Sequence, residues 1–136
     1  MRSDGRALLS LPACLLAATA VLSACGGAPK RIVEAAPQFY PAGCEKEPWK
    51  IEGTFNEGEN FDDSLRRTIT VKIDGQTAIS GEISGGKDAN GEVTGKHGDH
   101  ALTAVCTSKP RPDNAEVDDI RCVLMVDNKR TVTLSF

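Results

Sequence analysis

The sequence predicts an all-β fold, a small antiparallel meander that forms a barrel or a sandwich of about seven strands. Apolar and polar residues alternate with the two-residue period of strands, most clearly over residues 69–73, and no helical period is seen beyond residue 48. Turn dipeptides, Asp74-Gly75 and Gly98-Asp99, separate the alternating segments. A chain of 136 residues is long enough for one small domain and too short for two.

The first 24 residues have the layout of a secretory signal peptide. Two arginines precede an apolar run over residues 7–21. This run is shorter than the roughly 20 residues that a membrane-spanning helix needs, and Pro12 interrupts it. We therefore predict that residues 1–24 are removed from the mature protein.

Leu22, Ser23, Ala24 and Cys25 follow the apolar run and resemble the lipobox of bacterial lipoproteins. The resemblance implies a lipoprotein signal peptide over 1–24 and a diacylglycerol on the Cys25 thiol. It also implies acylation, such as by palmitate, of the new amino terminus. Because Gly26 rather than Asp follows the cysteine, the resemblance further implies an outer-membrane location, with the anchored protein facing the periplasm. Several acyl chains, at about 0.8 kcal/mol per buried methylene, make a durable anchor.

Residues 25–43 contain several prolines and glycines and no regular period, so we predict a lipidated flexible tether there. Residues 44–136 then form a single β domain. The mature chain keeps 14 basic and 18 acidic residues, because residues 1–24 hold two of the 16 basic and one of the 19 acidic residues. With this acidic balance we expect no nucleic acid as a partner.

The expected strands follow one another in chain order and are joined mostly by short connections. The strand over 69–73 leads into Asp74-Gly75, which predicts a type I′ hairpin turn because both central positions need positive φ. The charged stretch 56–67 and the proline-containing stretch 108–117 are predicted to be longer connections. The seven expected strands are 49–55, 69–73, 76–84, 92–96, 101–107, 119–126 and 130–136.

Three cysteines lie beyond Cys25, namely Cys44, Cys106 and Cys122. An odd number in an oxidising compartment predicts one disulfide and one further thiol. We favour the pair Cys106 and Cys122, because both lie on the predicted inward faces of successive antiparallel strands. The alternative is a disulfide that joins Cys44 to one of these strands.

His97 and His100 bracket the predicted turn at Gly98-Asp99. A tight turn would bring both imidazoles together with Asp99 between them, and this set is a candidate site for zinc or copper. The alternative is a solvated turn that binds no metal or other cofactor. The acidic stretches 56–63 and 88–91 do not have the spacing of a calcium-binding loop and are expected to be solvated.

Five of the six aromatic residues fall within residues 39–61, and the sixth is Phe136. Their clustering predicts that they plug one end of the barrel or fasten the tether to it. The alternative is an exposed recognition patch beside acidic loops.

The sequence contains no nucleophile elbow, phosphate-binding loop or zinc-binding helix motif, so we expect a protein that is not an enzyme. We predict a membrane-anchored periplasmic lipoprotein that binds or scaffolds an envelope protein or a cell-wall component. One alternative is an inhibitor or immunity protein against a cell-wall hydrolase. The segment 84–87 resembles the Ser- and Lys-bearing loops of C-type lysozyme inhibitors, but their aromatic motif is lacking and no residue role is carried over. A second alternative is a metal-handling lipoprotein.

Overall fold

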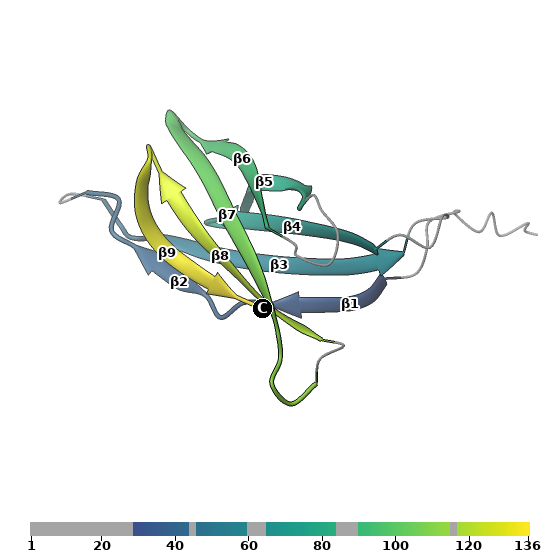
Figure 1. Cartoon of the computed structure of the whole chain (residues 1–136). Coiled ribbons are helices and arrows are strands. Elements are labelled where there is room, and N and C mark those ends of the chain that lie inside the picture. Colours follow the sequence, from purple (N-terminus) through teal and green to yellow (C-terminus); the bar gives the residue numbers. More distant parts are fainter. Residues whose placement is uncertain (1–28, 44–45, 60–64, 84–89, 115–116) are drawn as a thin grey trace, which may run out of the picture.

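In a computed structural model of the chain, the residues described are 29–43, 46–59, 65–83, 90–114 and 117–136. They form nine strands of one antiparallel sheet, which curls into a half-barrel (Figure 1). The predicted all-β class and antiparallel meander are confirmed. The strands are β1 (Pro29–Glu34), β2 (Gln38–Tyr40), β3 (Trp49–Glu59), β4 (Leu65–Ile73), β5 (Gln76–Glu82), β6 (Gly91–His97), β7 (His100–Pro110), β8 (Asp118–Val126) and β9 (Lys129–Ser135).

The strand order is β1-β3-β4-β5-β6-β7-β8-β9, and β2 pairs with β3 beyond the end of β1. The half-barrel therefore has two different ends. We call the turn end the one that carries the β2–β3 connection and the tight turns at 74–75, 98–99 and 127–128. We call the loop end the opposite one, where β1 begins and where β3, β5 and β7 end.

The prediction of a flexible tether over 25–43 is wrong for most of that range. Strand β1 pairs with residues 54–58 of β3, and β2 pairs with residues 49–51. The two strands together act as one edge strand, with a bend at residues 35–37. The prolines led to the wrong prediction. Pro29 is the first residue of β1 and Pro37 lies in the bend, and proline is tolerated at the first residue of a strand and outside the strands. Residues 25–28 lie outside the described residues.

The charged stretch 56–67 was also predicted as a connection, yet β3 continues to Glu59 and β4 starts at Leu65. Register explains the difference, because Glu57 lies directly opposite Arg67 across the two strands. Opposite charges at facing positions stabilise a strand pair that the hydrophobic pattern alone does not reveal.

The predicted tight turns are present. Asp74 and Gly75 have φ of 51° and 79°, as a type I′ turn requires, and Asp127 and Asn128 repeat the pattern with 49° and 63°. Gly98 has φ of 57° between the paired residues His97 and His100. These turns set the register of the hairpins on either side of them.

The concave face of the sheet buries the core, and side chains near the end of the chain pack across it onto β3. A Cβ atom at Gly53 would lie 2.8 Å from Leu134 Cδ1 and 2.9 Å from Phe136 Cζ. The rings of Phe55 and Phe136 have centroids 6.0 Å apart. Glycine at position 53 therefore lets the last strand pack directly onto the backbone of β3. The fully buried core side chains include Ile51, Phe55, Ile69, Val71, Ile73, Leu102, Ile120 and Leu124.

The weakest pairing in the sheet joins β5 to β6, where Ile79 opposite Gly95 is the one registered pair between these strands in the described residues. A Cβ atom at Gly95 would lie 2.0 Å from the carbonyl oxygen of Ala78. Only glycine permits this close approach of the two backbones, so position 95 keeps the halves of the sheet joined.

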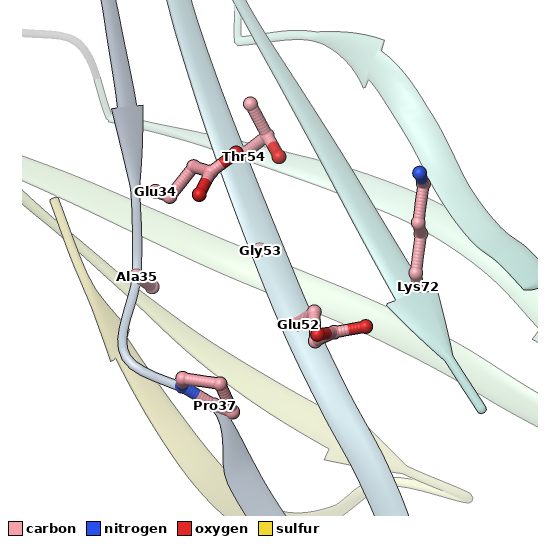
Figure 2. A pocket seen from close by; sticks show the side chains of 7 residues that line it. All are labelled: Glu34, Ala35, Pro37, Glu52, Gly53, Thr54 and Lys72. Carbon is pink, nitrogen blue, oxygen red and sulfur yellow. The ribbon is translucent and has the colours of Figure 1, made fainter. Parts of the chain in front are cut away.

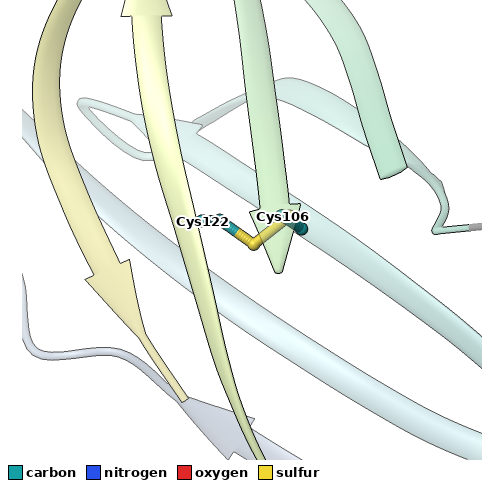
Figure 3. Close-up of a disulfide and its surroundings, with 2 residues drawn as sticks. All are labelled: Cys106 and Cys122. Carbon is teal, nitrogen blue, oxygen red and sulfur yellow. A yellow bond between two sulfur atoms is a disulfide. The ribbon is translucent and has the colours of Figure 1, made fainter. Parts of the chain in front are cut away.

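The predicted disulfide between Cys106 and Cys122 is present (Figure 3). The two residues are direct partners on β7 and β8, and both are buried in the core. Their sequence separation is 16. Cys44, the alternative partner, lies outside the described residues. Cys106 and Cys122 are bonded to each other.

Replacing both cysteines by alanine, Cys106→Ala with Cys122→Ala, should lower the free energy of unfolding by about 3 kcal/mol, because the closed loop restricts the unfolded chain. Urea unfolding under non-reducing conditions measures the change. A reductant should destabilise the wild-type protein by a similar amount and leave the double variant unaffected. Equal stability of both proteins without reductant would contradict a structural role for the disulfide.

Candidate functional site

Trp49, the single tryptophan of the chain, is the centre of an aromatic cluster at the turn end. Its ring centroid lies 5.8 Å from that of Tyr40, 4.9 Å from that of His97 and 5.2 Å from that of His100. Both imidazoles are nearly perpendicular to the indole, with interplanar angles of 77° and 71°. We call Tyr40, Trp49, His97 and His100 the turn-end cluster.

The two-residue period of the strands explains why these side chains meet. Trp49 lies two residues before the buried Ile51, and His100 lies two residues before the buried Leu102. Side chains two apart on a strand share one face, so both rings point toward the concave side of the sheet. His97 is the direct cross-strand partner of His100 and shares that face. The curl of the sheet then brings β3 across to the β6–β7 hairpin.

A carboxylate from the next turn contacts this cluster. Asp127 Oδ2 lies 2.6 Å from His100 Nδ1, and its Oδ1 accepts the Ala101 N–H at 3.0 Å. The hydrogen bond with His100, followed by that from the Ala101 backbone, holds the pKa of Asp127 below its ordinary value. Because Asp127 engages Nδ1 of His100, Nε2 is the ring nitrogen that can contact another group.

The predicted set His97, Asp99 and His100 is only partly assembled. The structure brings the two histidines together, but the carboxylate on His100 is Asp127 rather than Asp99. Within the described ranges, no group of three or more His, Cys, Asp or Glu side chains could hold a metal ion. The sequence prediction missed Asp127 because His100 and Asp127 are 27 positions apart. They meet only through the register of β7 and β8.

The described aromatic residues occupy different positions: some pack at the turn end of the half-barrel or in its core, and one lies on the surface. Tyr40 and Trp49 are partly buried and pack on the core at the turn end, as predicted for a plug. Phe55 and Phe136 lie inside the core itself. Phe39 instead faces outward from β2 and is exposed. Phe61 lies outside the described residues.

A buried arginine organises the loop end. Arg67 Nε donates to Glu57 Oε2 and Nη2 donates to Asp118 Oδ2, each at 2.9 Å. All three side chains are at most 16% exposed. The ion pairs connect the neighbouring strands β3 and β4 to β8, which lies in the other part of the strand order. The triad therefore ties the first half of the sheet to the second.

Arg31 adds a second link across the loop end. Its Nη1 donates to the Asp118 carbonyl at 3.0 Å, and its guanidinium lies 5.9 Å from the centre of the Phe55 ring. The edge strand β1 is thereby joined to β8 by a side chain rather than by a backbone ladder. Arg67 Nη1 is buried and has no hydrogen-bond partner in the described part of the chain.

A shallow depression lies on the convex face beside the bend between β1 and β2 (Figure 2). Its volume is about 200 Å³, and Glu34, Glu52, Thr54 and Lys72 are among the residues that line it. Glu52 also pairs with Lys50 at 2.6 Å. These side chains belong to the solvent-facing side of the sheet, so the depression is separate from the turn-end cluster.

A scan against models of known protein families found no match, and searches of curated proteins and of solved structures found none either. Across the described residues, no helix is long and apolar enough to span a membrane. The segment 84–87, which carried the similarity to lysozyme inhibitors, lies outside the described residues, and that alternative stays a prediction.

Changing Arg67→Met should lower the free energy of unfolding by about 3–5 kcal/mol, because two mostly buried carboxylates lose their partner. The neighbouring change Arg66→Met is the matched control. The Arg66 side chain is 58% exposed and lies 3.6 Å from Glu82, so its loss should cost about 0–1 kcal/mol. Equal effects of the two changes in urea unfolding would contradict a special role for the buried triad.

Proposed function

We propose that this protein is a bacterial lipoprotein, anchored in the outer membrane by a lipid on Cys25 and facing the periplasm. In this proposal its half-barrel is a non-enzymatic module that binds or scaffolds an envelope protein or a cell-wall component. The motif Leu22-Ser23-Ala24-Cys25 after an apolar run is the observation that carries the proposal.

The start of β1 supports a close attachment to the bilayer. Pro29 begins the sheet four positions after Cys25, and an extended chain spans at most about 3.6 Å per residue. The tether therefore reaches about 14 Å at most. The loop end, where β1 begins, lies next to the membrane in this arrangement, and the turn end points away from it.

The turn end is then the surface offered to the periplasm. Strand β3 runs from Glu59 at the loop end to Trp49 at the turn end, 11 residues in all. At about 3.3 Å per residue this strand extends roughly 36 Å. The turn-end cluster is thus held at a distance from the lipid by a rigid strand.

Replacing Cys25 by serine should abolish lipid attachment. In a Gram-negative host supplied with labelled palmitate, the wild-type chain should carry the label and begin at residue 25 by mass spectrometry. The Cys25→Ser variant should carry none, because a hydroxyl cannot form the thioether, whereas Cys44→Ser should stay labelled. A wild-type chain with residues 1–24 still attached would contradict the anchor. Turnover of an envelope substrate by the purified protein would contradict the non-enzymatic role.

The predicted orientation can be tested with the single tryptophan. When the lipidated protein is placed in vesicles with nitroxide-labelled headgroups, Trp49 fluorescence should be quenched little. In a Trp49→Phe background, Leu65→Trp puts the indole at the loop end, at a residue that is 43% exposed, and strong quenching is expected. Equal quenching at both positions in a protein shown to be acylated would contradict the orientation while leaving the lipid anchor intact.

A further inference from the structure

We propose that His97 and His100 bind one Cu(I) ion at the turn end, with Asp127 as the residue that orients His100 and Trp49 as a cover for the ion. The proposal is independent of the lipid anchor. In the set predicted from the sequence, Asp127 takes the place of Asp99, and it orients His100 rather than binding the ion. The protein ligands are then two, His97 and His100.

The two histidines are placed to share an ion. They are direct partners across the β6–β7 hairpin, immediately before and after its two-residue turn. Facing residues of an antiparallel pair have Cβ atoms about 4.5–5.5 Å apart. Both rings also contact the same indole, so they lie on the same side of the hairpin. The proposal requires a single small cation to reach one nitrogen of each ring.

Asp127 supplies the outer contact that histidine ligands typically have. A ligand imidazole usually donates its second ring N–H to a carboxylate or carbonyl, which fixes the tautomer and the ring orientation. The 2.6 Å contact from His100 Nδ1 to Asp127 Oδ2 is such a contact. It leaves Nε2 of His100 as the donor to a metal. The His100 side chain is 43% exposed, so an ion can reach it from solvent.

The number of donors favours Cu(I). Zinc in proteins is almost always held by four ligands. Imidazole nitrogen is a ligand for copper, and two such donors on opposite sides of the ion are enough for Cu(I). Trp49 lies against both imidazoles, so a cation between them sits beside an indole, whose π electrons attract positive charge. Binding forms two nitrogen–copper bonds, displaces water or a carrier ligand from the ion, and transfers no electron.

Trp49 makes the site measurable. The test uses the full chain with Cys14, Cys25 and Cys44 changed to serine, so that no thiol outside the Cys106–Cys122 disulfide competes for copper. Cu(I) is added without oxygen, with ascorbate as reductant and a coloured Cu(I) chelator as competitor. We expect one ion per chain and quenching of Trp49 fluorescence at the same equivalence point.

Variants separate the proposed roles. His97→Ala and His100→Ala should each weaken binding by at least 100-fold, and Asp127→Asn by roughly 10–100-fold, as loss of an outer carboxylate does. Asp99→Asn, the same chemical change in the neighbouring turn, is the matched control and should leave affinity unchanged. Circular dichroism checks folding, and His97→Gln and His100→Gln replace any alanine variant that does not fold.

Three results would overturn the proposal. The first is copper binding of unchanged affinity in the folded variant that lacks both histidines. The second is failure of the chain that lacks Cys14, Cys25 and Cys44 to take Cu(I) from the chelator. The third is tighter binding of zinc than of Cu(I), which would contradict the assigned ion.

Discussion

The packing of β9 onto Gly53 is the contact on which the whole half-barrel depends. A long antiparallel sheet with one apolar face must cover that face, and here the sheet covers it by curling until its last strand reaches its first long one. Any side chain at position 53 would meet Leu134 and Phe136 at less than 3 Å. With glycine there, Phe55 and Phe136 share one core, and the strands that bear Trp49 and the two histidines converge at the turn end.

The two ends of the half-barrel use different chemistry to stay closed. At the loop end, the Arg67–Asp118 ion pair and the Arg31 hydrogen bond join strands that no backbone ladder connects. At the turn end, an indole and two imidazoles fill the space between β3 and the β6–β7 hairpin. The charged side chains at the loop end are largely buried, whereas the aromatic end keeps the His100 imidazole partly exposed to solvent. The second arrangement is the one suited to ligand exchange.

Features encoded locally could be predicted from the sequence. The alternation over 69–73, the Asp74-Gly75 turn and the inward positions of Cys106 and Cys122 each follow from residues close together or from a strict period. Strands β1 and β2 were missed, because prolines at strand boundaries look the same as prolines in a linker. The partnership of His100 with Asp127 was also missed, as was the triad around Arg67. Both depend on which strands become neighbours, and no local pattern encodes that choice.

Among the described residues, β5 and β6 share one registered pair, which lies between two continuous blocks of the sheet, residues 29–82 and 91–135. The disulfide lies wholly inside the second block, so it does nothing to hold the blocks together. Partial opening of the native protein should begin along this line, and amide protons on either side of it should exchange with solvent before those of β3 and β4. The cross-link thus stabilises one hairpin, whereas the two blocks are joined by the close fit of Gly95 against the backbone of Ala78 and by side-chain contacts such as Arg67 with Asp118.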